Sequence, residues 1–268
     1  MVNTEKAPIS SIHNPKIQFL RALLTNKSAR AEHGLYVVEG IRLAEEAITA
    51  GLNPRTILYS SQLSARGSEL ITGLRSRNCE VVEVYPDVLD RLSDTETSQG
   101  ILLVLPQQSK PLPASTDLVL IIDQLRDPGN MGTILRSAAA VGVQAVFITP
   151  GSVDPLMPKV VRAGMGAHLQ LCIQQADWQW IQEYCTKNKP DPLRILLADS
   201  NGGTNMWQTD LTGPIALVVG GEAEGPGTAA RSHCDDLIHI PMPGKFESLN
   251  AGVATSILLY EIIRQRKS

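Results

Sequence analysis

The sequence predicts an α/β protein in which a small domain precedes a larger one with a mostly parallel sheet. After residue 117, strand-like apolar runs alternate with helix-length segments, which is typical of a parallel sheet covered on both faces. The stretch 106–116 holds three prolines among polar residues and favours an exposed linker. Hydrophobic residues make up 43% of the 268 residues and charged ones 19%, the balance of a globular chain. We therefore predict domains over 1–106 and 117–268, joined by a linker over 107–116.

The first domain alternates helical patterns with short strand-like runs. The predicted helices are Ile17–Leu24, Ile41–Ala50 and Ser68–Arg77. The predicted strands are Leu35–Val38, Thr56–Tyr59, Glu80–Val84 and Ile101–Leu105. This alternation predicts a small α/β domain.

The second domain contains six predicted strands and ends in the strongest helical pattern of the chain. The strands are Leu118–Asp123, Ala145–Thr149, Leu169–Ile173, Arg194–Ala198, Ile215–Val219 and Leu237–Ile240. Ser248 suits the N-cap of the final helix, and apolar residues follow it at helical spacing. Ile262 and Ile263 widen the apolar surface of this helix beyond one stripe, which favours a subunit interface and predicts a homodimer.

Charge is spread unevenly along the chain. The net charge of −3 carries no general signature of nucleic-acid binding, but residues 1–30 hold five basic residues against one acid. A solvated helix face and a patch that contacts phosphates both explain this cluster. The candidate RNA-binding residues in it are Lys16, Arg21, Lys27 and Arg30.

Cysteine spacing and hydropathy bear on the compartment. The four cysteines form no C-x-x-C pair, which fits reduced thiols in a cytosol and predicts neither a disulfide framework nor a zinc site. The histidines show no metal-ligand spacing. No apolar run reaches the roughly 18 residues that span a membrane, and the first residues lack the apolar core of a signal peptide. We expect a cytoplasmic protein that binds no metal and no membrane.

The junction at 121–136 is the most informative segment. A buried-strand run ends in a Pro-Gly turn, Asn130 then opens a helix, and Arg136 lies just over one turn inside it. Such a junction leaves backbone N–H groups and a polar side chain at a strand's carboxyl end, where open α/β sheets bind ligands. Alternatively, Asn130 only caps the helix and Arg136 only pairs with a carboxylate.

A second segment, 218–227, repeats the design of a strand followed by a polar loop. Gly220 and Gly221 allow the flat group of a ligand to approach the backbone closely. Glu222 either finds a partner beside the buried strand end or is solvated on a surface turn.

The third segment, 240–251, follows the last predicted strand. Its Ile-Pro-Met run offers backbone groups that sheet pairing cannot use, because proline lacks a donor. Ser248 and Asn250 place two small polar side chains in the first turn of a helix. Singly they are caps; together with the other two loops they predict the wall of a site.

A rival motif occurs at Gly225–Ala230, which fits the dinucleotide fingerprint G-x-G-x-x-[G/A]. The fingerprint belongs after the first strand of a βαβ unit, whereas this stretch follows a late strand and contains the stiff Pro226. This context argues against a nicotinamide enzyme. The chain also lacks G-x-x-x-x-G-K-[ST] and G-x-S-x-G.

Taken in order, D-P-G-N-M-G-T-I-L-R, G-G-E-A-E-G and I-P-M-x₅-S-L-N resemble the three motifs of the SpoU (TrmH) family of RNA ribose methyltransferases. The earlier stretches Ser11-x-x-Asn14-Pro15 and Val37-Val38-Glu39-Gly40 are similar to the substrate-binding domain that precedes many such enzymes and resembles ribosomal protein L30e.

The resemblance implies a SPOUT-type domain with a C-terminal trefoil knot that binds S-adenosylmethionine and is completed across a homodimer. The implied cofactor contacts are Gly220, Ile240 and Leu249, with Gly221 and Met242 adjacent. The implied catalytic and substrate-positioning residues are Asn130, Arg136, Glu222, Ser248 and Asn250. Arg136 is the family's proposed base, but a guanidinium that stays protonated can equally stabilise a developing alkoxide.

The implied activity is methyl transfer to a ribose 2′-hydroxyl of RNA. The L30e-like first domain favours 23S ribosomal RNA, because transfer-RNA members often consist of a bare catalytic domain. A tRNA ribose 2′-O-methyltransferase is the alternative within this class. A non-catalytic RNA-binding assembly factor is the alternative outside it, and the intact polar residues of the motifs argue against it.

Overall fold

The computed structural model describes residues 7–75, 79–93, 98–107, 110–221, 225–244 and 247–267. The chain divides into two compact units. The N-terminal unit comprises Met1–Gln108 together with Leu156–Arg162, and the C-terminal unit comprises Ser109–Pro155 and Ala163–Ser268. The segment Leu156–Arg162, which the sequence assigns to the second domain, therefore packs within the N-terminal unit.

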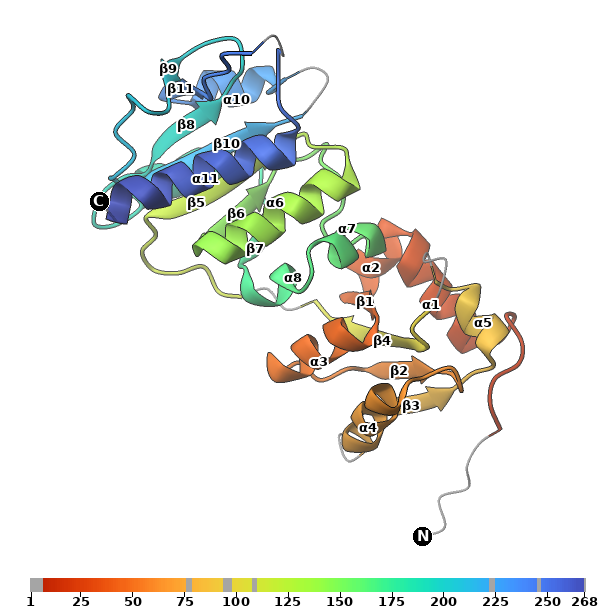
Figure 1. Cartoon of the computed structure of the whole chain (residues 1–268). Helices are drawn as coiled ribbons and strands as arrows, with labels where there is room; N and C mark the ends of the chain where they lie inside the picture. The colour runs from red at the N-terminus through yellow and green to blue at the C-terminus, as the bar shows by residue number, and fades with distance from the viewer. Residues whose placement is uncertain are drawn as a thin grey trace. The chain divides into compact units, whose positions relative to one another are not determined.

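The N-terminal unit contains a four-stranded mixed sheet in the order β1-β4-β2-β3 (Figure 1). Strand β4 pairs antiparallel with both β1 and β2, and β2 pairs parallel with β3. The strands are β1 (Leu35–Glu39), β2 (Thr56–Tyr59), β3 (Glu80–Glu83) and β4 (Ile101–Pro106). The helices are α1 (Pro15–Thr25), α2 (Lys27–His33), α3 (Ile41–Thr49), α4 (Ala65–Leu74) and α5 (Pro86–Asp90), with α7 (Pro158–Ala163) reaching in from later in the chain.

The C-terminal unit contains a seven-stranded sheet in the order β7-β6-β5-β10-β8-β11-β9, and every neighbouring pair is parallel. The predicted mostly parallel sheet is confirmed. The strands are β5 (Leu118–Asp123), β6 (Ala145–Ile148), β7 (Ile173–Gln175), β8 (Arg194–Ala198), β9 (Thr204–Asn205), β10 (Ile215–Gly220) and β11 (Asp236–His239). Strand β5 is buried along its whole length, which explains its unbroken apolar run.

Helices cover the sheet of the C-terminal unit. They are α6 (Pro128–Val141), α8 (Ala167–Gln170), α9 (Trp178–Lys187), α10 (Thr228–His233) and α11 (Ala251–Lys267). Alternate residues of β5, β6, β8 and β10 pack against α9 and α10 in one core cluster. Helices α6 and α11 lie side by side (Figure 1). Ser137 and Ser256, whose hydroxyl oxygens are 2.7 Å apart, join these two helices.

Two local predictions are wrong. The run Leu169–Ile173 is not a strand, because α8 ends at Gln170 and β7 begins only at Ile173. A short apolar run cannot be assigned to helix or strand by periodicity alone, and Gly166, with φ 86°, starts the short helix. Ser248 does not cap α11, since the helix begins at Ala251 and the side chain of Asn250 accepts from the N–H of Val253 at 3.2 Å. The trefoil knot stays a prediction.

Within the described ranges, no helix combines the length and apolarity needed to cross a membrane. The same residues contain no group of three or more His, Cys, Asp or Glu side chains arranged to hold a metal ion.

Candidate active site

A cavity of about 650 Å³ opens at the carboxyl ends of β8, β10 and β11. We call it the edge cavity. Open α/β sheets bind ligands at this edge because the loops that follow neighbouring parallel strands meet there. Seven of the predicted site residues line it: Gly220, Gly221, Ile240, Met242, Ser248, Leu249 and Asn250. The second and third predicted loops therefore form one wall, although about twenty residues separate them in the sequence.

The Gly220–Gly221 pair, which we call the ridge, lies in the wall of the edge cavity, and neither position has room for a side chain because other protein atoms lie where a Cβ would be. A Cβ on Gly220 would lie 2.7 Å from the Cα of Pro226, and a Cβ on Gly221 would lie 2.9 Å from the carbonyl oxygen of Gln124. Gly221 also forms a β-bridge with Gly225. With no side chain at either position, backbone atoms form this part of the cavity wall at the end of a central strand.

Part of the wall is apolar. Ile240 and Met242 are half-buried along the edge cavity, and the side chain of Leu249 is 39% exposed. An exposed leucine that lines a concavity provides a surface for a flat or apolar group. A cavity of this size, lined by both apolar and polar groups, suits a small-molecule ligand.

Asn130 and Asn250 meet in space although they lie far apart in the sequence. The side-chain N–H of Asn250 donates to the side-chain oxygen of Asn130 at 2.8 Å. Asp127, and not Asn130, caps α6, because its carboxylate accepts from the Asn130 N–H at 2.7 Å. The side chain of Asn130 is therefore left for Asn250 and for a ligand. The starts of α6 and α11 come together beside the edge cavity.

Arg136 lies apart from this constellation. It is exposed on α6 and does not line the edge cavity. Ser137, the next residue, marks the side of α6 that contacts α11. Among the described residues, no carboxylate pairs with Arg136, so the alternative of a simple surface ion pair finds no support there. Glu222, the remaining predicted catalytic residue, lies outside the described residues.

The four basic candidates of the N-terminal unit occupy different environments. Arg21 and Lys27 are exposed, and Lys16 forms an ion pair with Glu80. Arg30 is only 4% exposed and donates to the carbonyl oxygens of Leu23, at 2.6 Å, and Leu24, at 3.3 Å. These carbonyls lie at the end of α1, where a helix leaves its acceptors unsatisfied. Arg30 therefore joins α2 to α1 and does not form part of an exposed patch.

Sequence reasoning missed an ion pair on the edge cavity. Asp199 follows β8 directly, its side chain is 5% exposed, and its carboxylate lies 2.6 Å from the guanidinium of Arg231 on α10. The same carboxylate accepts from the N–H of Asn201 at 2.9 Å. The signal that could have revealed Asp199 is its position, because it follows a predicted strand as the other loop residues do.

Comparisons with known proteins agree with this architecture. Residues 117–260 match the SpoU rRNA methylase family, and residues 14–103 match the MRM3-like substrate binding domain. The chain is 31% identical over 267 residues to a 23S rRNA (uridine(2479)-2′-O)-methyltransferase of Streptomyces viridochromogenes, covering 95% of this chain and 91% of the relative. It is 29% identical to the 23S rRNA (guanosine(2553)-2′-O)-methyltransferase RlmP of Bacillus subtilis, covering 95% and 98%. The crystal structure of the SpoU methyltransferase AviRb from S. viridochromogenes in complex with AdoMet superposes with a TM-score of 0.88 at 30% identity, covering 95% of this chain and 99% of that one.

Proposed function

This chain belongs to the SpoU rRNA methylase family, and on that premise we propose that it methylates a ribose 2′-hydroxyl of 23S ribosomal RNA with S-adenosylmethionine as methyl donor. The observation that carries the proposal is the edge cavity, which two of the motif loops line. Asn130, from the third motif, is hydrogen-bonded to Asn250 in the wall of this cavity. Two relatives that match over more than nine tenths of both chains are 23S rRNA 2′-O-methyltransferases, which favours this substrate.

The edge cavity fits S-adenosylmethionine. Its volume of about 650 Å³ holds a nucleoside-sized ligand, and the ridge at Gly220 and Gly221 leaves the backbone open to hydrogen bonding with a flat purine. Ile240, Met242 and Leu249 provide apolar contacts. When bound, the cofactor supplies a methyl group activated by its attachment to a sulfonium.

The polar residues of the chain act on the ribose. Asn130 and Asn250 form a hydrogen-bonded pair that can orient a sugar hydroxyl, and Ser248 lines the same cavity. Arg136 stabilises the negative charge that develops on the ribose oxygen, because a guanidinium stays protonated at neutral pH and is a poor base. The 2′-hydroxyl distinguishes RNA from DNA, so the substrate is RNA.

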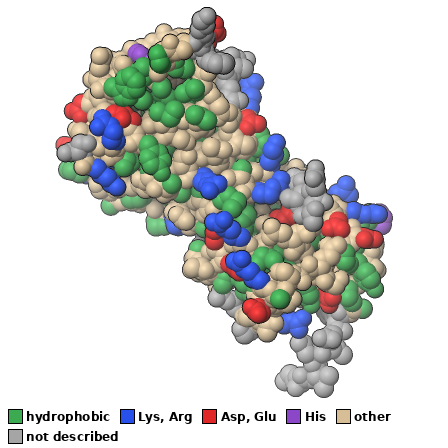
Figure 2. All heavy atoms as spheres, in the orientation of Figure 1, with side chains coloured by type: hydrophobic (Ala, Val, Ile, Leu, Met, Phe, Trp, Pro, Cys, Tyr) green, Lys and Arg blue, Asp and Glu red, His purple; other side chains and the backbone are tan. Residues whose placement is uncertain are grey.

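We further propose that the protein acts as a homodimer across α11. Val253, Ile257 and Tyr260 recur at helical spacing on this helix, and Val253 and Tyr260 are 47% and 58% exposed. Trp207, at 62% exposed, is a further unburied aromatic of the same unit. Figure 2 shows hydrophobic side chains gathered on the face of the C-terminal unit that carries α11. Arg136 does not line the cavity of its own chain, and we propose that dimerisation brings the partner's Arg136 to that cavity.

RNA binding is assigned to exposed basic residues of the N-terminal unit, chiefly Arg21 and Lys27. The compartment is the cytosol, which the four free cysteines support, because free thiols persist where glutathione keeps them reduced.

The test is methyl transfer from labelled S-adenosylmethionine to 23S rRNA, with 2′-O-methyl positions mapped on the product. We expect label in one ribose of the large-subunit RNA and none in tRNA. Saturable binding of both RNA and cofactor without label transfer would support a non-catalytic assembly factor instead, and label in tRNA alone would overturn the rRNA assignment.

A further inference from the structure

Asp123 is a buried carboxylate at the carboxyl end of a strand, and the proposed chemistry gives it no role. It ends the central strand β5 after five apolar residues and is 1% exposed. A charged group in such a place is retained only where donors compensate the loss of water. Its partners therefore indicate what it is there to hold.

Three donors from three different segments converge on this carboxylate. The Thr149 hydroxyl, after β6, donates to Oδ1 at 2.9 Å, and the Trp178 indole N–H, on α9, donates to the same oxygen at 3.0 Å. The other oxygen, Oδ2, accepts from the backbone N–H of Gly227 at 3.0 Å. The two oxygens thus have separate tasks: Oδ1 binds the surrounding core, and Oδ2 binds the residue that precedes α10.

The contact with Gly227 is connected to the wall of the edge cavity by the turn that contains Gly227. Gly227 follows Pro226, whose Cα would lie 2.7 Å from a Cβ on Gly220, and Gly225 bridges to Gly221. The turn Gly225–Gly227 therefore packs against the ridge that lines the cavity. Movement of Gly227 away from Asp123 would release the turn that supports this ridge.

We propose that Asp123 is a positioning residue for the cofactor site: through Oδ2 and the Gly227 amide it holds the turn 225–227 and, with it, the ridge at Gly220 and Gly221. This inference rests on the proposed function for the identity of the ligand, but the mechanical link itself is a property of the cofactor-free chain. Asp123 itself does not line the edge cavity.

The chain offers variants that separate the two oxygens. Asp123→Ala removes all three hydrogen bonds. Thr149→Val and Trp178→Phe each remove one donor from Oδ1 and leave the Gly227 contact in place. If Asp123 positions the ridge, Asp123→Ala raises the dissociation constant of S-adenosylmethionine in calorimetry by about 10- to 100-fold, the range expected for losing a hydrogen bond to a charged group. The two controls stay within about threefold of wild type, although both melt at a lower temperature.

A double variant keeps the inference testable even if Asp123→Ala does not fold. In Asp123→Asn alone, the amide NH₂ must face either the Gly227 or the Trp178 N–H, both pure donors. Combining Asp123→Asn with Trp178→Phe lets the new side chain turn its oxygen to Gly227 and its NH₂ to Thr149. The double variant is expected to bind S-adenosylmethionine within about threefold of wild type, a rescue that a merely structural role of the carboxylate does not predict.

Amide hydrogen exchange of cofactor-free protein gives a readout that needs no ligand. The peptide that contains Gly227 is expected to exchange faster in Asp123→Ala than in wild type, and at the wild-type rate in both controls and in the double variant. Equal losses of cofactor affinity in Asp123→Ala, Thr149→Val and Trp178→Phe, or unchanged exchange at Gly227 in Asp123→Ala, would overturn the inference. A wild-type protein that binds no S-adenosylmethionine contradicts the proposed function instead, and the exchange experiment still decides the role of Asp123.

Discussion

At the carboxyl edge of the large sheet, loops that are distant in sequence converge on one cavity, whereas the basic residues of the first two helices of the N-terminal unit separate into different environments. The convergence at the edge follows from topology, because parallel neighbours all end at the same side. No such rule gathers the charges of α1 and α2. There, Arg30 is buried and binds backbone carbonyls while Arg21 and Lys27 face solvent. Charge clusters in sequence are thus weaker predictors of a site than strand ends.

The largest expected effect concerns methyl transfer at the edge cavity. Arg136→Ala should lower the rate of methyl transfer by about 100- to 1000-fold, because one preformed donor to a developing oxyanion contributes on that order. The affinity for S-adenosylmethionine should stay near wild type, since Arg136 does not line the edge cavity. Single-turnover rates and calorimetry measure the two quantities. Arg194→Ala is the matched control, because this arginine begins β8 and therefore lies at the amino-terminal ends of the strands, away from the edge cavity.

Mixing two inactive variants sharpens the same prediction. When Arg136→Ala and Asn250→Ala protomers exchange freely, half of the dimers are mixed, and each mixed dimer has one cavity with an intact Asn250 and the partner's intact Arg136. Activity should recover to about a quarter of wild type if Arg136 acts across the interface. A mixture no more active than its components would place Arg136 within its own subunit.

The three loops singled out in the sequence supply many of the residues that line the edge cavity or contact its wall, and the errors are local. Gly220, Gly221, Ile240, Met242 and Leu249 all line the edge cavity, as the resemblance implies. The sequence could not show which polar residue caps which helix, because several candidates lie within one turn and only packing selects among them. Asp127 takes the cap of α6, and Asn250 takes the cap that Ser248 was expected to form.

Other features depend on contacts between segments that no local pattern encodes. Asp123 reads as the last residue of an apolar strand, and its three donors come from positions 149, 178 and 227. Arg30 reads as a member of a basic cluster, but its guanidinium reaches the end of α1 because α2 folds back on that helix. Periodicity and spacing describe one element at a time, and these roles arise only when elements meet.

A second prediction concerns the proposed interface. Tyr260→Glu places a charge in the apolar stripe of α11 and should convert the dimer to a monomer in light scattering at micromolar concentration, because a buried unpaired carboxylate opposes association. Methyl transfer should fall with dimer content if the partner's Arg136 completes the site. Lys187→Glu, at an exposed position of α9, is the control and should leave the mass unchanged. A Tyr260→Glu protein that remains dimeric places the interface elsewhere.

The third prediction contrasts residues within the basic cluster. Arg30→Ala should lower the free energy of unfolding by about 2 kcal/mol, because it removes charge-assisted hydrogen bonds from buried carbonyls, and should leave the affinity of the folded protein for RNA unchanged. Arg21→Ala with Lys27→Ala should do the reverse, reducing the slope of log affinity against log salt by about two. Urea unfolding and RNA titrations at several salt concentrations measure both. A reduced salt slope in Arg30→Ala would return this residue to the RNA-binding surface.

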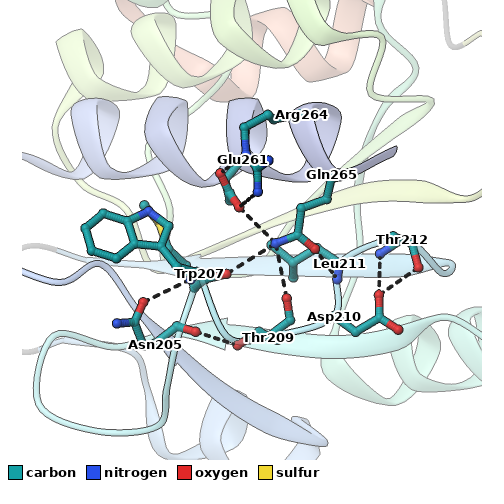
Figure 3. Close-up of polar contacts among 10 residues, drawn as sticks. Asn205, Trp207, Thr209, Asp210, Leu211, Thr212, Glu261, Arg264 and Gln265 are labelled. Carbon is teal, nitrogen blue, oxygen red and sulfur yellow. Dashed lines mark hydrogen bonds and ion pairs between the residues drawn. The ribbon is translucent and has the colours of Figure 1, made fainter. Parts of the chain in front are cut away.

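The smallest expected effect lies in the polar network that ties α11 to the segment 205–212 (Figure 3). Gln265 donates to the carbonyls of Met206 and Thr209 and accepts from the N–H of Leu211, and it also donates to Glu261 at 2.8 Å. Hydrogen bonds from Arg264, joined by the one from Gln265, lower the pKa of Glu261 to about 2. Because the folded pKa lies below the ordinary value of 4.5, the stabilisation is complete above pH 4.5 and is lost as the pH falls toward 2.

Glu261→Gln should therefore cost about 1 kcal/mol of unfolding free energy at pH 7, a modest amount because Arg264 is largely exposed to solvent. The same substitution should flatten the decline of stability between pH 4.5 and 2 relative to wild type, because no carboxylate remains to be protonated in the folded network. Thermal unfolding across this pH range measures both effects. Glu183→Gln removes a carboxylate from an exposed pair on α9 and should leave the pH profile nearly unchanged. Parallel profiles for wild type and Glu261→Gln would show that protonation of Glu261 does not weaken the contact between α11 and the segment 205–212.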